Sequence, residues 1–583
     1  MARRKTGGLY VDTVVRRYKD RTYTSHLLRR SYRAGGQVKK QTLGNITHLP
    51  PALVDLVRRG LAGEQFVAAR AAQQAFTITR SLPHGHVAAV LAMGRALGLE
   101  ALLARTPSRA RALVVGMLVS RILAPASKLA TSRAWDSTTL GESLGIAGAA
   151  EDELYAALDW LLARQPAVER ALAQRHLGNG VLVLYDVSST YLEGQGCPLA
   201  RHGHSRDHRP DRPQIVFGLV LDEAGRPLAV EAFAGNTADP ATVDTQLEKI
   251  RTRFGLHDVV LVGDRGLLTQ ARIGRLKELG GWGWISCLRA PAIQALAAHG
   301  TIQPSPLDAR NLLEVTDPAY PGERLLVCKN PLVAAERARK REALLAQTER
   351  ALAQVAAAVA RGRLKTAAAI GLRAGRVVDR WQMAKHFTLT IADGAFAYAR
   401  NAAAIAAEAA LDGLYVVRTS VGADRLGARG VVRAYKSLSH AERAFRVLKV
   451  SDLQVRPIYH YKEARVRAHL FLCLLAAYVQ WHLEQAWAPL LFEEEAPPLR
   501  LDPVATAERS PTARAKDQTK HTPDGLPVHS FRSLLGDLAT LTKNRCVPHG
   551  AADEAAAAFT LLATPTPLQT RALALLGLSP TAM

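Results

Sequence analysis

Three acidic residues stand where metal-assisted chemistry on a phosphodiester would need them. Asp186 follows the apolar run "VLVLY", Asp264 follows "VVLVG", and Glu442 lies among five basic side chains in "YKSLSHAERAFRVLK". A carboxylate at the end of a buried strand is costly unless it is paired or metal-bound. Two hard cations about 4 Å apart can activate an attacking oxygen and stabilise a leaving one, and oxygen ligands suit Mg²⁺. We therefore predict that these three residues form a catalytic metal site.

The spacing around Glu442 supports two interpretations. Positions seven apart on a helix differ by only about 20° in direction, so Tyr435, Glu442 and Lys449 share one face if the whole stretch is helical. A phenol and an ammonium beside a metal-binding carboxylate suit a phosphate. Alternatively, Ser439 and Glu442 form a capping box, and the carboxylate only marks the start of a helix.

The elements that must position the aspartates follow one another in a recognisable order. The run "VLVLYDVSSTYLE" predicts a β-rich strand with Asp186 inside it, at the end of the apolar part "VLVLY", and "QIVFGLVLDEAGRPLAVEAFAG" predicts two more strands around a turn. A helix, the strand before Asp264, another helix and another strand follow. This is the order of a ribonuclease H-like core, in which the first and fourth strands lie parallel and adjacent. The two aspartates would then meet at one edge of the sheet.

The complete prediction is an α/β protein with a ribonuclease H-like catalytic core. An Ala- and Arg-rich insertion, including a long helix within residues 331–378, precedes the last catalytic helix. N-terminal basic and helical regions are predicted to bind DNA. The predicted segments are a basic N-terminal segment 1–59, a helical region 60–175, the first part of the core 176–300, the insertion 301–425, the last part of the core 426–490, and a C-terminal accessory region 491–583.

The charge of the chain points to a polyanionic partner. Its formal net charge is +25 over 583 residues, and nucleic acid is the first candidate for so basic a protein. Residues 1–59 hold fourteen Lys or Arg against three Asp, and "TYTSHLLRRSYRAGGQVKKQTLGNI" predicts two strands around a Gly-Gly turn. Such a ribbon fits a DNA groove or backbone; a solvated hairpin is the alternative.

Several classes of protein are not supported by the sequence. The five cysteines form no C-x-x-C pair, which argues against a zinc finger or a disulfide framework. No phosphate-binding loop of the ATPase type is present, and no apolar run is long enough for a membrane span. The N-terminus "MARRKTGGLY" lacks an apolar signal region, so we expect a cytoplasmic protein.

The motifs "YDVSSTYLEG", "GNTADPAT", "VGDRG" and "YKSLSHAERAFRVLK" together resemble those of bacterial insertion-sequence transposases of the DDE class. The resemblance is to the cut-and-paste superfamily that resolves its ends through DNA hairpins, and it extends to about Leu490. The superfamily signature is Tyr, two residues, Arg, three residues, Glu, six residues, Lys. Tyr435, Glu442 and Lys449 fit it, whereas Leu438 stands where Arg is usual.

The resemblance implies an activity, a cofactor and partners. Asp186, Asp264 and Glu442 would hold two Mg²⁺ ions, with Mn²⁺ able to substitute, while Tyr435 and Lys449 contact phosphates. The partners would be double-stranded DNA, as terminal inverted repeats and as target, and a second copy of the chain in a synaptic complex. Metal-activated water would cut the ends, hairpins would form, and the element would be joined to target DNA at the nucleoid.

Leu438 cannot contact a phosphate, so another cation is needed near Glu442. Arg446 lies one turn beyond Glu442, about 40° from its direction, and is the predicted DNA-binding substitute. Arg443 points roughly 100° away and is the weaker candidate.

Two other functions and three other groups of residues stay open. The chain could be a ribonuclease H-like structure-specific nuclease, such as a junction resolvase, or a non-catalytic repressor derived from a transposase. His202, His204 and His208 form either a zinc site or a DNA-facing loop. Asn236 and Asp239 either lie near the catalytic site or form a capped turn. Trp381 either holds a flipped base or packs in a core.

Overall fold

The computed structural model describes residues 8–19, 21–34, 36–64, 75–302, 311–498, 502–505, 507–549 and 553–579. The chain divides into two compact units. The first combines residues 1–81 with residues 544–561, and the second combines residues 82–543 with residues 562–583. Segments from the end of the chain therefore belong to both units.

The N-terminal part is a three-stranded antiparallel sheet followed by a helix. The elements are β1 (Leu9–Tyr18), β2 (Arg21–Ala34), β3 (Gln37–Asn45) and α1 (Pro51–Leu61). The predicted pair of strands around the Gly-Gly turn is confirmed as β2 and β3, and Gly36 adopts a φ of 79° in that turn. β1, which pairs with β2 along its whole length, was not predicted. A second small sheet has the order β16 (Phe559–Leu562), β15 (Thr542–Pro548), β4 (Phe76–Pro83).

The larger unit is built on an eight-stranded mixed sheet, so the chain has a mixed α/β fold. Its strand order is β10-β11-β14-β9-β8-β5-β6-β7. β5 is parallel to β8, and β8 is parallel to β9, while the other pairs along the sheet are antiparallel. The strands are β5 (Val181–Tyr191), β6 (Gln214–Asp222), β7 (Pro227–Ala234), β8 (Val259–Val262), β9 (Gly283–Cys287), β10 (Leu312–Val315), β11 (Arg324–Lys329) and β14 (Leu414–Thr419).

The predicted alternation of strands and helices around the aspartates is confirmed. α9 (Asp239–Glu248) follows β7, and α10 (Gln270–Glu278) lies between β8 and β9. The β-rich run with Asp186 inside it is confirmed as β5, but the expectation that Asp186 stands at the end of a buried strand was wrong. The reason is that β6 pairs with β5 as far as Tyr191, whereas β8 stops opposite Leu184. Asp186 therefore lies just past the point where β5 loses its parallel neighbour.

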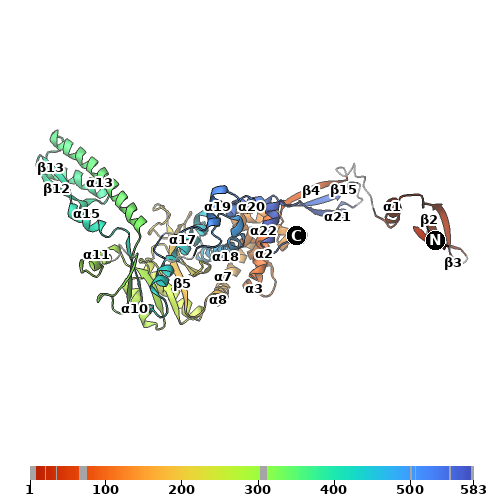
Figure 1. The fold of residues 1–583 in the computed structure, drawn as a ribbon, viewed down its shortest axis with the longest axis horizontal. Helices are drawn as coiled ribbons and strands as arrows, with labels where there is room; N and C mark the ends of the chain where they lie inside the picture. The colour runs from red at the N-terminus through yellow and green to blue at the C-terminus, as the bar shows by residue number, and fades with distance from the viewer. Residues whose placement is uncertain are drawn as a thin grey trace. The chain divides into compact units, whose positions relative to one another are not determined.

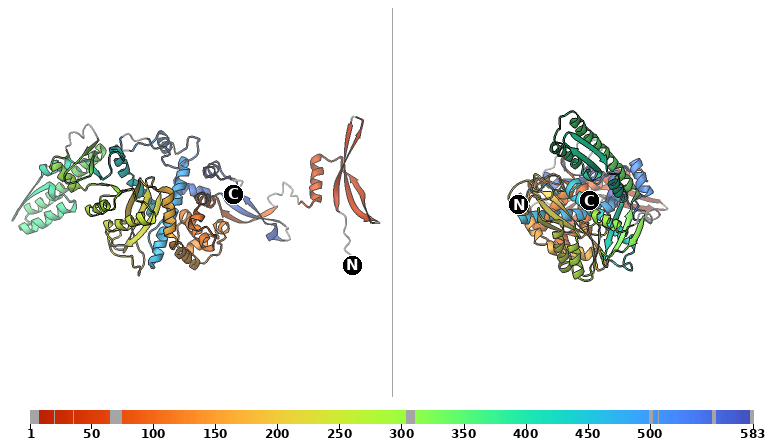
Figure 2. Two further views of the ribbon diagram at one scale, coloured as in Figure 1. Left: turned by 90° about the horizontal axis from the view of Figure 1, so that it is seen from below. Right: turned by 90° about the vertical axis from the view of Figure 1, so that its left-hand side faces the viewer.

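Helices bury the sheet on the side of β7. α18 (Glu463–Trp487) contacts β7, α4 (Arg109–Leu123) and α7 (Glu151–Leu162). In the left view of Figure 2, this light-blue helix runs between the yellow-green strands and the orange helices. Among the described residues, no single helix is long and apolar enough to cross a membrane. α4 and the next helix, α5 (Lys128–Ala134), meet that test only as a pair with a bend between them.

The segment before Glu442 carries a small helical layer with its own core. It comprises α13 (Pro331–Ala360), α14 (Ala367–Arg380), β12 (Phe387–Ala392), β13 (Ala395–Arg400) and α15 (Ala402–Ala409). The predicted long helix is α13, and the green elements around it lie together in Figure 1. Leu345, Leu352 and Val378 are among the side chains that fill this core.

The C-terminal residues contribute to the main core. They form α19 (Pro511–Thr519), α20 (Phe531–Ala539) and α22 (Pro567–Ala574). Leu534, Leu538 and Leu573 are fully buried in the same core as α18. The indole N–H of Trp487 donates to the carbonyl of Ala572 at 2.9 Å.

Candidate active site

One cavity of about 490 Å³ brings together the three carboxylates singled out in the sequence. Its polar lining comes from β5, the loop after it, the start of α9, the turn after β8, and α17 (Leu438–Arg446). The polar residues of the lining are Asp186, Ser188, His204, Arg206, Asp239, Asp264 and Glu442. The predicted site residues therefore meet, although they come from three distant parts of the chain.

The two aspartates are brought to the same level by strand register. Leu184 of β5 is opposite Val262 of β8 in the parallel pair. Two residues farther along each segment stand Asp186 and Asp264. The carbonyl of Asp264 accepts from the N–H groups of Leu267 and Leu268, at 3.0 and 3.1 Å, in the turn that leads to α10. This turn holds Asp264 beside the strand that carries Asp186.

Glu442 reaches the cavity from α17, which packs on β5. α17 begins at Leu438, and no side chain caps its start. The capping-box interpretation of Ser439 and Glu442 is therefore wrong, because the helix already runs through both residues. The ring of Phe445, one turn along α17, packs edge-on against the ring of Phe217 of β6, with 5.4 Å between the ring centroids. This contact fixes the helix on the sheet.

The carboxylates of Asp186, Asp264 and Glu442 concentrate negative charge in the cavity. Burial raises the pKa of Asp186 to about 7, and the negative charges of Asp264 and Glu442 add to the rise. The N–H of Val187, 2.8 Å from the Asp186 carboxylate, and the charge of Arg206 act in the opposite direction. A cation between the carboxylates would relieve this repulsion.

The donor set fits a hard divalent cation, since carboxylate oxygens are the ligands that Mg²⁺ prefers. Among the described residues, however, no group of three His, Cys, Asp or Glu side chains converges as a closed metal site. The three carboxylates line one cavity without converging on a common point. The residues present would hold the metal from three sides of the cavity, and chelation would require their side chains to close in.

Tyr435 and Lys449, predicted to share a face with Glu442, lie outside the lining of the cavity. Tyr435 belongs to a separate helix, α16 (Ala428–Lys436), and burial raises its pKa, with the nearby Cys287 adding to the rise. Lys449 lies in the π-helical turn η4 (Val447–Ser451) and is only 8% exposed. The predicted stripe is therefore divided among three helical segments.

Lys449 lies behind the cavity wall. Its ammonium is 2.5 Å from the carboxylate of Asp207 and 3.0 Å from the hydroxyl of Ser188, and Ser188 lines the cavity. Burial lowers the pKa of Lys449. In this arrangement Lys449, the lysine of the superfamily signature, is bonded to Asp207 and Ser188 of its own chain.

The two arginines beside Glu442 differ in their partners. Arg443 forms ion pairs with Glu493 at 2.8 Å and Glu484 at 3.2 Å. Arg446 is exposed, and no side-chain hydrogen bond or ion pair joins it to another residue of the described chain. Leu438 packs against the main core. Only Arg446 of the two arginines is therefore available for an outside ligand.

β5 and the loop between β5 and β6 carry residues that sequence reasoning missed. Arg206 and Ser188 line the cavity, and neither was predicted as a site residue. The basic run "RHGHSRDHRPDR" was the available signal, but it was weighed only for its histidines. Of these His204 lines the cavity, and the zinc interpretation gains no support from the described residues.

The structure also shows where the other residues with two interpretations lie. Asp239 lines the cavity, so its predicted nearness to the site is confirmed, and no side chain caps the start of α9. For Asn236, no side-chain hydrogen bond within the described part of the chain distinguishes a place near the site from a capped turn. Trp381 ends α14 half-buried against the small core of the inserted layer, while Trp282 and Trp284 are buried in the main core.

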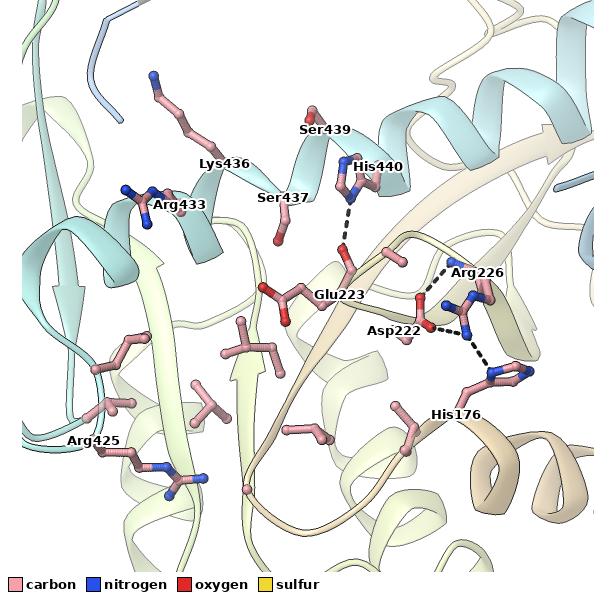
Figure 3. A pocket seen from close by; sticks show the side chains of 18 of the residues that line it. His176, Asp222, Glu223, Arg226, Arg425, Arg433, Lys436, Ser437, Ser439 and His440 are labelled. Carbon is pink, nitrogen blue, oxygen red and sulfur yellow. Dashed lines mark hydrogen bonds and ion pairs between the residues drawn. The ribbon is translucent and has the colours of Figure 1, made fainter. Parts of the chain in front are cut away.

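A larger cavity, about 870 Å³, lies near the start of β5 and is lined partly by α16 and α17. Figure 3 shows interactions between several of its polar groups. Arg226 joins Asp222 at 3.3 Å and His176 at 2.5 Å, and His440 bonds to the carbonyl of Glu223. It contains none of the three carboxylates, so the smaller cavity is the candidate active site.

Comparison with known proteins identifies the family. Residues 180–479, which include all three carboxylates, match the model of the transposase DDE domain. Because this match spans more than half of the chain, the protein belongs to the DDE transposases. Residues 11–73 match the N-terminal domain of IS1634 family transposases, and the chain is accordingly an insertion-sequence transposase. A DDE domain implies an enzyme that cleaves DNA and transfers strands with divalent metal ions.

No curated protein matches the chain. Among solved structures, a piggyBac transposase synaptic complex with hairpin DNA is similar with a TM-score of 0.32 and 7% identity, over 78% of this chain and 76% of that chain. At this TM-score the likeness carries no argument about the present chain.

Proposed function

We propose that this transposase cuts DNA at the terminal inverted repeats of its own element, with Asp186, Asp264 and Glu442 as the catalytic carboxylates. The observation that carries the proposal is the single cavity that all three line. The strand order β7-β6-β5-β8-β9, with β8 parallel to β5, supports a ribonuclease H-like core around it. The helical layer containing α13 would be its insertion.

The proposed cofactor is a pair of Mg²⁺ ions, for which Mn²⁺ could substitute. When bound, such ions activate the attacking oxygen and stabilise the leaving one. The chain supplies the carboxylates that hold them. The Val187 N–H holds one oxygen of Asp186 toward the backbone and leaves the other for the cavity. The backbone of Asp264 is fixed by its turn and that of Glu442 by the packing of α17, so only the side chains would have to move to hold the ions.

The carboxylates can be tested one at a time. We expect Asp186→Asn, Asp264→Asn and Glu442→Gln each to abolish strand cleavage while leaving the affinity for end DNA within a few-fold of the wild type. The substrate is a duplex with the inverted repeat found by sequencing DNA that flanks the gene. Glu278→Gln is the control, because Glu278 is exposed and pairs with Arg275 along α10, away from the cavity lining. Cleavage near the wild-type rate in Mg²⁺ by any of the three variants would contradict the assignment.

Hairpin intermediates are the finer part of the proposal. The freed 3′ hydroxyl would attack the opposite strand, and Arg446, exposed beside the cavity, would contact the distorted DNA. Tyr435 and Lys449 remain predicted DNA contacts, although Lys449 would have to leave Asp207 to reach a phosphate. Binding of two ends would be the work of a homodimer in a synaptic complex.

The hairpin step is testable on pre-nicked end DNA. We expect Arg446→Ala to lower the hairpin yield more than it slows first-strand nicking, because Arg446 has no partner of its own in the described chain. Arg443→Ala should lower it less, because Arg443 is engaged by Glu484 and Glu493. Equal hairpin yields from the wild type and Arg446→Ala on a denaturing gel would rule out this role.

A further inference from the structure

Arg206 is the one guanidinium among the described residues that line the carboxylate cavity. Its Nη2 lies 2.5 Å from Oδ2 of Asp239, and about a quarter of its side chain (24%) is exposed. A guanidinium offers several N–H donors in a planar fork. One carboxylate on Nη2 therefore leaves other donors for a second anion in the cavity.

The loop that carries Arg206 is anchored on both sides of it. The N–H of Arg206 donates to the hydroxyl of Ser189 on β5 at 3.0 Å. The next side chain, Asp207, is only 2% exposed and lies 2.5 Å from Lys449 and 2.6 Å from Arg456. Breaking such a buried pair is costly, so the backbone on this side of Arg206 is firmly held. The guanidinium is consequently pre-positioned in the cavity.

The arginines of α17, which lie near Glu442, do not line the cavity as Arg206 does. Leu438 stands where the signature has arginine and packs into the core. Arg443 is engaged by two glutamates, and Arg446 does not line the cavity. The pocket would otherwise present carboxylates to a phosphodiester with no fixed cation of the protein to bind its oxygens.

We propose that Arg206 binds the scissile phosphate in place of the arginine missing at position 438. Asp239 and the buried pair of Lys449 with Asp207 are positioning residues for it. A guanidinium suits this task, because its fork matches the oxygens of a phosphate. The inference rests on the proposed function, since it needs the scissile phosphate to lie among the three carboxylates.

The first test is a binding measurement that needs no cleavage. End DNA is prepared with a normal phosphate or with a neutral methylphosphonate at the scissile position, and Kd is measured in Ca²⁺. We expect Arg206→Ala to weaken binding of normal DNA about ten-fold, as for loss of a hydrogen bond to a charged group. With the methylphosphonate, wild type and variant should bind alike. An equal loss on both DNAs would overturn the proposal.

Matched variants distinguish loss of the contact between Arg206 and the phosphate from loss of positive charge in general and from disturbance of the loop. Arg209→Ala removes a cation of the same loop that pairs with Asp211 and Glu193 instead; any loss of affinity should be the same on both DNAs. Lys449→Ala should lower the melting temperature and, because it loosens the loop that holds Arg206, weaken binding of normal DNA less than Arg206→Ala does while leaving methylphosphonate DNA less affected. If Lys449→Ala or Arg446→Ala, and not Arg206→Ala, shows the methylphosphonate-dependent loss, the phosphate contact belongs to that residue.

The second test is cleavage in a single turnover. We expect Arg206→Ala to be slower by about 10²- to 10³-fold, as for removal of one transition-state donor, with Arg206→Lys partly restored and Asp239→Asn intermediate. Unchanged melting temperatures would exclude misfolding, and Arg206→Lys repeats both tests if the alanine variant does not fold. If Asp186→Asn is inactive but Arg206→Ala cleaves normally, this inference alone fails. If Asp186→Asn also cleaves normally, the proposed function fails with it.

Discussion

At the scale of residues, the ionisation of the partly buried Asp186 depends on the charges of its neighbours. Asp186 has a pKa near 7 because burial and the charges of Asp264 and Glu442 oppose its ionisation. Between its ordinary pKa of 3.8 and about 7, the folded protein holds a proton that the unfolded chain releases. Asp186 therefore stabilises the metal-free fold at low pH, and this contribution is lost as the pH rises through about 7.

The titration predicts a pH-dependent difference in melting temperature. Without divalent metal, Asp186→Asn should melt a few degrees above the wild type at pH 8, and the difference should shrink at pH 5, where Asp186 is protonated. Adding Mg²⁺ at pH 8 should stabilise the wild type and not the variant, because a ligand stabilises only the state that binds it. Thermal scans from pH 5 to pH 8 measure this, and a difference that stays constant across that range would contradict it.

At the scale of elements, the sheet β1-β2-β3 is a surface structure. None of its described side chains is fully buried, and several of its cations are exposed, among them Arg16, Arg17, Lys39 and Lys40. A ribbon with so little apolar interior is suited to contact with a partner, and all but its first two residues lie within the match to the IS1634 N-terminal domain. We expect this ribbon to contact DNA phosphates.

Neutralising these four cations to glutamine should weaken DNA binding and flatten its salt dependence. Each phosphate contact adds about 0.9 to the slope of log K against log salt, so the slope should fall by up to about 4. Changes at Arg275 and three other exposed cations of the larger unit provide the control. Filter binding or fluorescence anisotropy across a salt series makes the measurement, and an unchanged slope would show that the ribbon does not touch DNA.

At the scale of the whole molecule, each chain supplies a complete set of the three carboxylates. Asp186, Asp264 and Glu442 line one cavity of the larger unit, and all belong to one chain. A synaptic dimer would consequently contain two whole sites. This differs from a site shared between subunits, and mixing experiments can distinguish the two.

Mixing Asp186→Asn chains with Glu442→Gln chains should restore no cleavage, because every site in the mixture lacks one carboxylate. Wild-type chains mixed with either variant should cleave in proportion to the wild-type fraction or below it. The readout is cleavage of paired end DNA after co-refolding or co-expression. Restored activity in the mixture of the two variants would mean that the cavity is completed by a second chain.

The sequence by itself determined the scaffold of the site. Apolar runs of strand length, each followed by an aspartate, are local patterns, and they predicted β5, β8 and the alternation of helices around them. The Ala- and Arg-rich stretch of residues 331–378 predicted α13, which is likewise a local pattern. The resemblance in "YKSLSHAERAFRVLK" added Glu442 from a part of the chain more than 150 residues beyond Asp264, and the structure brings it to the same cavity.

Only the tertiary structure decided which basic side chains accompany the carboxylates. Helical spacing placed Tyr435 and Lys449 on the face of Glu442, but the chain divides there into α16, α17 and a π-helical turn, and Lys449 turns inward to Asp207. Arg206 lies in a loop without periodicity, so no pattern could assign it. The partners of a long, flexible cation are set by charges distant in sequence, and only folding brings those charges together.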